Sequence, residues 1–219
     1  MNPDISYPAL TRLCAMQSLL KELSLSGQRS VSSTELAGFL GISAHSVRKD
    51  INYLGEIGNF GAGYTVEKLY AHISNELCLN KQRNCCIVGL GRIGSAVLSY
   101  ERFVESSFTL VAGFDSDINL LDTIRTDVPV FPTYEIPDIV KKKKIELAIL
   151  AVPAHAAREI ADRLIAAGIK GIVNFTSAII NGRDSGVHVK NMDLITEMNV
   201  LAACISLDEH KKEKASEEK

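Results

Sequence analysis

Three glycines in the segment 85–103, CCIVGLGRIGSAVLSYERF, follow the spacing G-x-G-x-x-G between an apolar run and a helical pattern. Gly89 permits a tight turn as the chain leaves a strand, and Gly91 lets the backbone approach a phosphate group closely. Gly94 allows the following helix to pack closely on the strand. The free N–H groups and the positive dipole end of that helix favour an anion. The segment therefore predicts a phosphate-binding turn in a parallel α/β sheet.

An acidic residue follows at the distance expected of a dinucleotide site. Asp115 ends the apolar run TLVAGFD, about 20 positions after Gly94, as in the dinucleotide-binding fingerprint. Its carboxylate is suited to accept hydrogen bonds from the adenosine ribose and to repel a 2′-phosphate. Ser116 follows in place of an arginine, which favours NAD over NADP. The alternative is a Rossmann-like domain for a different ligand, such as a CoA-binding module.

The rest of this half alternates strand patterns with helix patterns. Apolar runs occur at TLVAGFD, VPVF, IELAILAV and GIVNF, and helical stretches at 93–103, 134–144 and 156–167 lie between them. Near-continuous apolar strands are typical of parallel sheets covered on both faces. We expect a Rossmann-like, doubly wound parallel sheet over residues 81–192. Cys85 and Cys86 are neighbours on its first strand, so their side chains should point to opposite faces as small buried hydrophobes.

The end of the chain combines an apolar helix pattern with a charged tail. DLITEMNVLAACISL is apolar at helical spacing, and DEHKKEKASEEK is charged with no apolar period. A helix this apolar is expected to pack on another surface, such as that of a second subunit, for which residues 193–208 would form the dimerisation helix. Residues 209–219 are expected to form a disordered, solvated tail.

Residues 1–80 have a helical pattern instead. The apolar spacing predicts a helix over 9–25. Ser32 or Ser33 caps a second helix that stops at Gly41, and Ser43 caps a third that stops near Gly55. Helix, short glycine-containing turn, helix is the helix-turn-helix pattern.

A glycine-rich segment follows the third helix. Gly58, Gly61 and Gly63 precede the β-favouring residues 64–66, which predicts a hairpin, the wing of a winged helix. A linking helix over 66–79 then leads to the second half.

The third helix, residues 43–54, separates its side chains into two faces. Val47, Ile51 and Leu54 share an apolar stripe that should face the core. The opposite face carries groups suited to base edges and phosphates, namely His45, Arg48, Lys49 and Asn52. The alternative is an ordinary solvated face. Residues 1–82 hold seven Lys or Arg against seven Asp or Glu, so DNA affinity would depend on local placement and on dimerisation.

Composition narrows the class of protein. With 46% hydrophobic residues the chain can bury a core, and no apolar run approaches the roughly 18 residues of a membrane helix. The N-terminal residues lack a signal-peptide pattern. Five cysteines match no zinc motif, and their odd number argues against a disulfide framework. We expect a cytoplasmic protein with no membrane partner and no metal.

Candidates for catalysis are few. A hydride-transfer enzyme needs a proton donor or acceptor near the nicotinamide. His155 follows a strand, but no carboxylate is placed to orient it, and His188 and His210 lie outside the mononucleotide-binding pattern. We therefore expect no catalytic residues and no enzyme, with an NAD-dependent oxidoreductase as the alternative.

Five segments in order resemble the Rex family of redox-sensing transcriptional repressors: SVRKDINYLGEIGNFGAGYTVEKL, CIVGLGRIGSAV, GFDSD, LAVPAHAAREIADRLIAAGIKGIVNF and KNMDL. The resemblance spans about residues 8 to 207. It implies a homodimer with a winged-helix domain, an NAD(H)-binding domain and a swapped C-terminal helix. It also implies a sensor of the NADH/NAD⁺ ratio that binds operator DNA and releases it when NADH binds, so that NAD(H) is a regulatory ligand.

The resemblance extends to individual residues. Tyr100 matches the family's tyrosine after the glycine loop, and Asp193 matches its acid near the C-terminal helix, a pair suited to distinguish NAD⁺ from NADH. The candidate cofactor-binding residues are Gly89, Leu90, Gly91, Arg92, Ile93, Gly94, Tyr100, Asp115, Ser116, Val152, Pro153, Asn174 and Asp193. The candidate DNA-binding residues are Ser43, His45, Ser46, Arg48, Lys49, Asn52, Asn59 and Phe60.

Two positions depart from the family pattern. Ser18 stands where the first helix usually has an arginine that pairs with the acid near the C-terminal helix. Asn59 and Phe60 stand where the wing usually has a basic tip. The first departure concerns the switching ion pair, and the second concerns the minor-groove contact.

Overall fold

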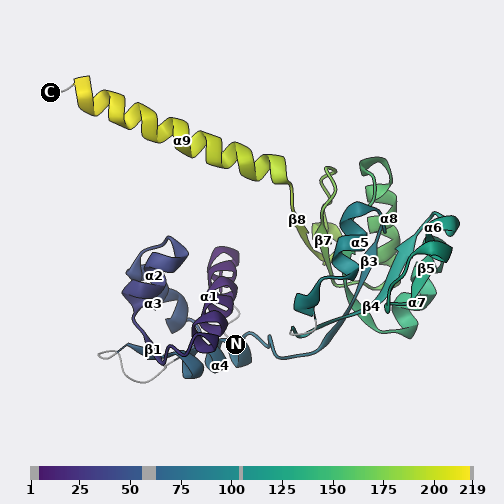
Figure 1. Cartoon of the computed structure of the whole chain (residues 1–219), viewed down its shortest axis with the longest axis horizontal. Coiled ribbons are helices and arrows are strands. Elements are labelled where there is room, and N and C mark those ends of the chain that lie inside the picture. Colours follow the sequence, from purple (N-terminus) through teal and green to yellow (C-terminus); the bar gives the residue numbers. More distant parts are fainter. Residues whose placement is uncertain (1–4, 56–62, 104–105, 218–219) are drawn as a thin grey trace. The chain divides into compact units, whose positions relative to one another are not determined.

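The computed structural model describes residues 5–55, 63–103 and 106–217. The chain forms two compact units, an N-terminal unit, Met1–Lys81, and a C-terminal unit, Gln82–Lys219 (Figure 1). Within the described ranges, no helix has both the length and the apolar character needed to cross a bilayer.

The N-terminal unit packs helices around an apolar core with a small sheet at one side. Its two strands pair antiparallel, with Ser30 opposite Thr65 and Val31 opposite Tyr64. The described elements are, in chain order, α1 (Tyr7–Leu25), β1 (Ser30–Val31), α2 (Ser33–Leu40), α3 (Ala44–Asn52), β2 (Tyr64–Thr65) and α4 (Val66–Glu76).

Local capping explains where α2 and α3 begin and end. The Ser32 hydroxyl accepts a hydrogen bond from the Glu35 amide at 3.1 Å, and the Glu35 carboxylate accepts one from the Ser32 amide at 2.7 Å. This reciprocal capping box satisfies two helix-end donors. Gly41 ends α2 with a φ of +64°, and the Ser43 hydroxyl accepts from the Ser46 amide at 3.0 Å. The predicted helix-turn-helix is therefore confirmed.

The predicted wing is described only at its end. Residues 56–62 lie outside the described residues, so the predicted hairpin is not tested there. Tyr64 and Thr65 pair with β1, and Val66 already begins α4.

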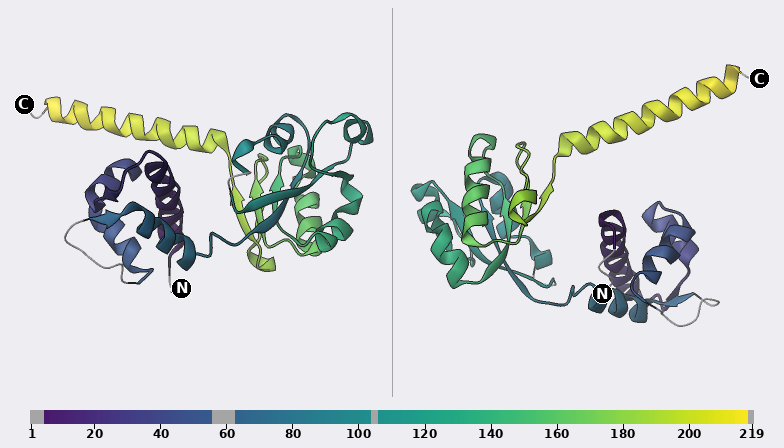
Figure 2. Two further views of the ribbon diagram at one scale, coloured as in Figure 1. Left: turned by 60° about the horizontal axis from the view of Figure 1, so that its bottom comes forward. Right: turned by 180° about the vertical axis from the view of Figure 1, so that it is seen from behind.

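The C-terminal unit is a six-stranded parallel sheet in the order β5-β4-β3-β6-β7-β8. Helices lie on both faces of this twisted sheet (Figure 2). This order is that of a doubly wound, Rossmann-like fold. Its strands and principal helices are β3 (Arg83–Val88), α5 (Arg92–Leu98), β4 (Phe108–Asp115), α6 (Ile118–Thr123), β5 (Val130–Pro132), α7 (Ile136–Lys142), β6 (Ile145–Leu150), α8 (Ala154–Ala167), β7 (Gly171–Asn174), β8 (His188–Asn191) and α9 (Leu194–Glu217).

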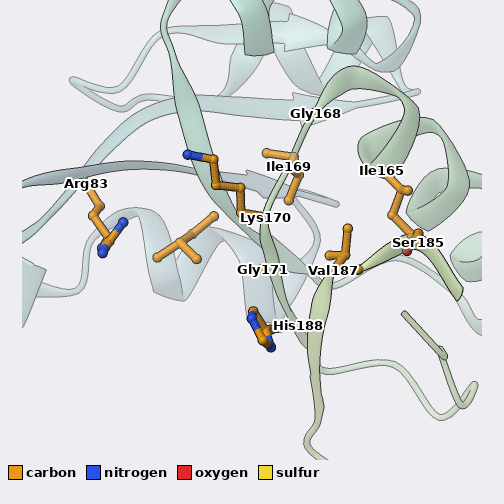
Figure 3. Close-up of a pocket in the computed structure, with 11 residues that line it drawn as sticks. Arg83, Ile165, Gly168, Ile169, Lys170, Gly171, Ser185, Val187 and His188 are labelled. Carbon is orange, nitrogen blue, oxygen red and sulfur yellow. The ribbon is translucent and has the colours of Figure 1, made fainter. Parts of the chain in front are cut away.

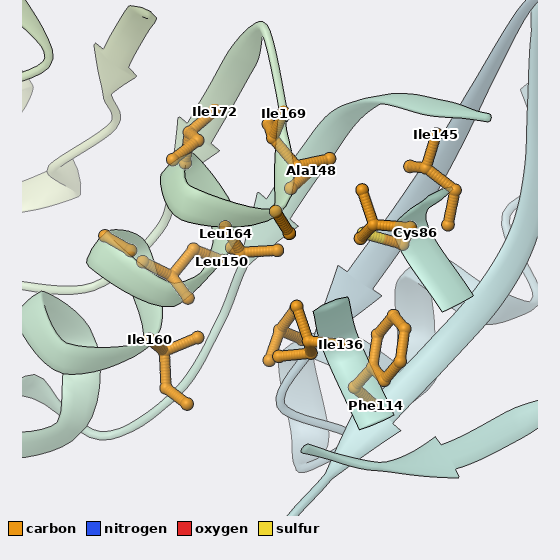
Figure 4. Close-up of a cluster of buried hydrophobic side chains, with 14 of the residues drawn as sticks. Cys86, Phe114, Ile136, Ile145, Ala148, Leu150, Ile160, Leu164, Ile169 and Ile172 are labelled. Atoms are coloured by element: carbon orange, nitrogen blue, oxygen red, sulfur yellow. The ribbon is translucent and has the colours of Figure 1, made fainter. Parts of the chain in front are cut away.

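Side chains from alternate strand positions fill the two faces of the sheet. One face buries Cys86 and Phe114 with residues of α7 and α8 such as Ile136 and Leu164 (Figure 4). On the other face α5 approaches Ile87, the neighbour of Cys86 along β3. The prediction that Cys85 and Cys86 are both buried is confirmed. Burial raises the pKa of the Cys85 thiol to about 11, so it stays protonated at neutral pH.

The C-terminal helix is longer than the sequence pattern predicted. Helix α9 continues to Glu217, so the expectation of a disordered tail from residue 209 is wrong up to that residue. Lysine, glutamate and alanine are good helix formers, and an existing helix adds residues easily. A hydrogen bond of 2.8 Å joins His210 Nδ1 and the Ser206 carbonyl, and Lys211 pairs with Asp208 at 3.2 Å.

An ion-pair network ties the start of β3 to β6 and β7. Glu146 accepts from Lys170 Nζ at 2.7 Å and from Arg83 Nη1 at 2.6 Å. The hydrogen bonds from Lys170 and then Arg83 lower the pKa of Glu146 to about 2. Because the pKa is lower in the folded chain than in the unfolded one, this stabilisation is complete above pH 5 and declines as the pH falls toward 2.

We expect Glu146→Gln to lower the free energy of unfolding by about 1–2 kcal/mol at pH 7, because two partly solvated cations lose their carboxylate. Urea denaturation at pH 7 and pH 3 should show the difference from wild type shrinking to less than half at pH 3. Glu159→Gln is the control, because its pair with Arg163 is exposed. If Glu146→Gln and wild type differed in unfolding free energy by the same amount at both pH values, the lowered pKa of Glu146 would not be the source of its stabilisation.

Candidate dinucleotide site and candidate nucleic-acid interface

The carboxyl ends of the parallel strands bring most candidate cofactor residues to one edge of the sheet. Gly89 follows β3, Asp115 ends β4, Val152 follows β6 and Asn174 ends β7. Strands β3 and β6 are neighbours whose connections lead to opposite sides of the sheet order. Ligands of doubly wound folds bind at this kind of switch point.

The three glycines of the loop have distinct geometries. Gly89 has a φ of +92°, and a Cβ there would lie 2.6 Å from the Ala151 carbonyl oxygen. A Cβ on Gly94 would collide with the Gly89 carbonyl, so α5 packs directly on the turn. A Cβ on Gly91 would meet no atom within 4 Å. The first and last glycines are thus required by the fold, and Gly91 leaves an open backbone surface that fits a pyrophosphate.

Asp115 holds the glycine loop as well as facing the edge of the sheet. Its Oδ2 accepts from the Leu90 amide at 2.6 Å, and its Oδ1 accepts from the Asp117 amide at 2.9 Å. The residue is half-buried and the neighbouring Ser116 is exposed. Each carboxylate oxygen has a second lone pair, so it can still accept a hydrogen bond from a ribose hydroxyl. Sequence reasoning predicted the ribose role and missed the loop contact.

The remaining candidates near the loop differ in exposure. Leu90 is buried, whereas Arg92 and Ile93 are exposed in the first turn of α5. Tyr100 is 52% exposed, and its ring meets the Phe103 ring edge-to-face at 6.1 Å. Tyr100 is therefore placed against an aromatic neighbour while much of its surface stays open.

Val152 and Pro153 lie in the short connection between β6 and α8. Val152 is half-buried and Pro153 exposed, so this turn forms part of the open edge. His155 is exposed in the first turn of α8.

Asn174 is fully buried and its polar groups are used within the chain. Its Nδ2 donates to the Ala178 carbonyl and to Asn191 Oδ1, at 2.7 and 2.8 Å. Its Oδ1 accepts from the amide and the hydroxyl of Thr176. The side chain therefore holds the loop after β7, and the cofactor-binding role of Asn174 stays a prediction.

Asp193 caps the start of α9. Its Oδ2 accepts from the Thr196 hydroxyl at 2.7 Å and its Oδ1 from the Ile195 amide at 3.2 Å. These hydrogen bonds, chiefly that from Thr196, lower the pKa of Asp193. The carboxylate is thus ionised at neutral pH, and the residue is half-buried between β8 and α9.

Helix α3 presents the predicted polar face. Val47, Ile51 and Leu54 are buried, as predicted. Arg48 Nη1 donates to the Ser33 hydroxyl of α2 at 2.8 Å, which holds the side chain across the helix-turn-helix. The exposed residues of α3 include His45, Arg48, Lys49 and Asn52.

The other candidate DNA-binding residues differ from these. The hydroxyls of Ser43 and Ser46 lie 2.9 Å apart and serve the helix cap. Asn59 and Phe60 lie outside the described residues. Ser18, where the family usually has arginine, is exposed on α1.

One charged pair of the N-terminal unit was missed by sequence reasoning. Asp50 of α3 is fully buried and accepts two hydrogen bonds from Arg12 of α1. The available signal was its spacing, since Asp50 follows Val47 by three positions and precedes Leu54 by four, next to the apolar stripe.

A hollow lies at the opposite, amino edge of the sheet, between Arg83, Lys170 and His188 (Figure 3). Both of its long cations are bonded to Glu146. Ligands of doubly wound sheets bind at the carboxyl edge, so this hollow lies at the edge opposite to the candidate dinucleotide site.

Two family models match parts of the chain. Residues 4–52 match the model described as "Putative DNA-binding protein N-terminus", and residues 80–178 match "CoA binding domain". The second match covers the glycine loop and five of the strands, β3 to β7.

Relatives and solved structures match nearly the whole chain. A redox-sensing transcriptional repressor Rex of Carboxydothermus hydrogenoformans is 36% identical over 93% of this chain and 98% of its own length. The Listeria monocytogenes serovar 1/2a Rex is 36% identical over 87% of this chain and 88% of its own.

Among solved structures, the Rex-family repressor RSP aligns with a TM-score of 0.82 at 32% identity, covering 96% of this chain and 99% of RSP. RSP in complex with β-NAD⁺ and operator DNA aligns with a TM-score of 0.84 at 32% identity, over 95% of this chain and 96% of that one. Together with the helix-turn-helix and the glycine loop, these matches show that the chain belongs to the Rex family of redox-sensing transcriptional repressors.

Proposed function

We propose that this chain is a transcriptional repressor that binds operator DNA through α3 and releases it when NADH binds at the carboxyl edge of the sheet. One observation carries the proposal: the same chain has a glycine loop held by Asp115 and a helix-turn-helix with an exposed polar face. Family membership supports it, since RSP was solved with β-NADH and, separately, with β-NAD⁺ and operator DNA. We further propose that it acts in the cytoplasm.

The glycine loop would hold the cofactor by its backbone. The open surface at Gly91 and the first amides of α5 would receive the pyrophosphate, and Asp115 would accept the ribose hydroxyls. Asp115 also aims the Leu90 amide, so it acts on the loop and the ribose together.

The bound nicotinamide supplies the signal, because it is positively charged in NAD⁺ and neutral in NADH. We assign its detection to Tyr100, which is 52% exposed, and to the ionised carboxylate of Asp193. A carboxylate favours a nearby cation over a neutral ring. Ser18 in place of the family's usual arginine means that the acid's counter-charge must differ in this chain.

Helix α3 is the proposed recognition helix. Its exposed face combines cations for phosphates with groups that read base edges. Arg48 is already held near the start of α2 by Ser33, which reduces the conformational entropy lost on binding.

Helix α9 is the proposed dimer contact. Every side chain from Leu194 to Lys214 is exposed in the single chain. Leu194, Met198, Leu201 and Ile205 are 57–73% exposed and follow the alternating four- and three-residue steps of a packing stripe. An apolar stripe of this kind marks a protein–protein contact.

A dimer supplies a means of switching. Two reading helices bind only half-sites spaced by about one helical turn or a multiple of it. A cofactor that favours a different rotation of the two subunits lowers operator affinity, by as much as its affinities for the two states differ.

A CoA-binding sensor is the second candidate, favoured by the family model that matches residues 80–178. Both ligands carry a pyrophosphate and an adenosine. The negative charge of Asp115 at the ribose position would repel the 3′-phosphate on the ribose of CoA, as it would repel the 2′-phosphate of NADPH. Calorimetry with NADH and CoA separates the two candidates.

We expect Gly91→Ala to weaken NADH binding at least tenfold by calorimetry, because its methyl group would occupy the surface that faces the pyrophosphate. Its melting temperature should change little, since a Cβ there meets no atom within 4 Å. Gly38→Ala on α2, with equally open surroundings, is the control and should bind NADH normally. Unchanged NADH affinity in Gly91→Ala would contradict the assigned site.

We expect Leu201→Asp to shift the molar mass measured by light scattering from two chains toward one, because a charge in an apolar helix contact loses its hydration. Lys212→Glu, on the polar part of α9, should remain a dimer. If Leu201→Asp stayed dimeric, α9 would not be the subunit contact.

A further inference from the structure

Asp50 is the one carboxylate that is fully buried among the described residues. Arg12 Nε donates to its Oδ2 at 2.6 Å and Arg12 Nη2 to its Oδ1 at 2.8 Å. Desolvating a charge is costly, and well-packed apolar residues often give equal or greater stability than a buried ion pair. Stability alone therefore does not account for a buried charge in α3.

The ion pair joins α1 to α3 and so constrains the orientation of α3. Apolar packing of Val47 and Ile51 holds the nine-residue helix against the core, but such contacts are non-directional and allow small rotations. An arginine–carboxylate fork is planar and directional. Arg12 extends from α1, a 19-residue helix that packs along α4. The ion pair therefore fixes the rotation of α3 relative to α1, the longest described helix of the N-terminal unit.

The residues that face outward on α3 adjoin this fork. Arg48 and Lys49 immediately precede Asp50, and Asn52 follows two positions later. The end of α3 has a second polar tie, since His72 Nε2 of α4 lies 3.0 Å from the Leu54 carbonyl oxygen. A rotation of α3 allowed by loss of the fork would displace all three outward side chains together.

We propose that the Arg12–Asp50 ion pair is a positioning device that sets the rotation of α3 and thereby operator affinity and specificity. The inference rests on the proposed function, because it requires α3 to read DNA. It also suits a DNA-binding half whose Lys and Arg only equal its Asp and Glu, since affinity then depends on where each cation points.

Asp50 could affect operator binding through its negative charge alone or by positioning α3. The two explanations predict opposite changes in operator affinity for Asp50→Asn. Removing a negative charge beside DNA strengthens binding if only charge matters. Loss of positioning weakens operator binding and lowers the ratio of operator to random-sequence affinity. If Arg12 instead contacted a phosphate directly, Arg12→Met would reduce the slope of log K against log salt by about 1, whereas positioning leaves that slope unchanged.

The experiment measures operator affinity by fluorescence anisotropy for full-length wild type, Asp50→Asn and Arg12→Lys. The probe is a labelled duplex that the wild-type protein has selected from random-sequence DNA, with a scrambled duplex beside it. Arg48→Ala is the benchmark for loss of an outward residue. Glu146→Gln is the matched control, because it breaks an ion pair of the other unit.

A double variant, Arg12→Met with Asp50→Leu, keeps the test decisive if a single variant fails to fold. Apolar side chains of similar size should restore stability without restoring direction. We expect its melting temperature to lie near that of wild type and its operator affinity to be at least tenfold weaker.

The same loss, at least tenfold, is expected for Asp50→Asn, with NADH affinity within twofold of wild type. Operator binding by Asp50→Asn or by the folded double variant at wild-type strength or tighter would overturn the positioning role while leaving the proposed function intact. A wild-type protein that selects no duplex from the pool would overturn both.

Discussion

The contact between Gly94 and the Gly89 carbonyl determines the geometry of the C-terminal unit's binding edge. No side chain fits between them, so α5 starts directly against the turn that ends β3. That approach leaves the surface at Gly91 open and brings the Leu90 amide to Asp115 at the end of the next strand. The parallel order of the sheet then places the turns after β6 and β7 at the same edge. The glycine loop therefore lies at an edge that the ends of β3, β4, β6 and β7 form together.

The N-terminal unit depends on orientation in a comparable way. Its core is apolar, and residues 1–82 hold as many Asp and Glu as Lys and Arg, so the unit has no net positive charge to attract DNA from a distance. Specific binding then relies on the placement of a few side chains on α3. Directional contacts of Arg12 with Asp50, and of His72 with the Leu54 carbonyl just after the helix, supply this placement. Because α4 is followed within a few residues by β3, the chain itself links the element that steadies α3 to the strand that ends in the glycine loop.

Much of this architecture follows from local sequence patterns. Ser32, Gly41 and Ser43 cap helices because short polar side chains and glycine satisfy helix ends wherever they occur. The glycine spacing identifies its turn for the same reason. The short strand β8 was missed, because it is largely exposed at the sheet edge and carries almost no apolar signal.

Other features depend on partners far apart in the sequence, which a pattern does not reveal. Asp50 resembles any charged helix residue until α1 brings Arg12 to it. The side-chain amide of Asn174 bonds to Asn191 and Thr176, and the position of Asn174 after an apolar strand does not predict these contacts. The charged end of α9 has no apolar period, which predicts a solvated tail, although its residues favour helix.

The central claim is that NADH bound at the glycine loop releases DNA held by α3. Its most direct test is the anisotropy of a labelled operator duplex with wild-type protein near half-saturation, as NADH or NAD⁺ is added to saturation. We expect NADH to raise the operator dissociation constant at least tenfold and NAD⁺ to leave it nearly unchanged. An unchanged dissociation constant while calorimetry shows NADH bound would contradict it.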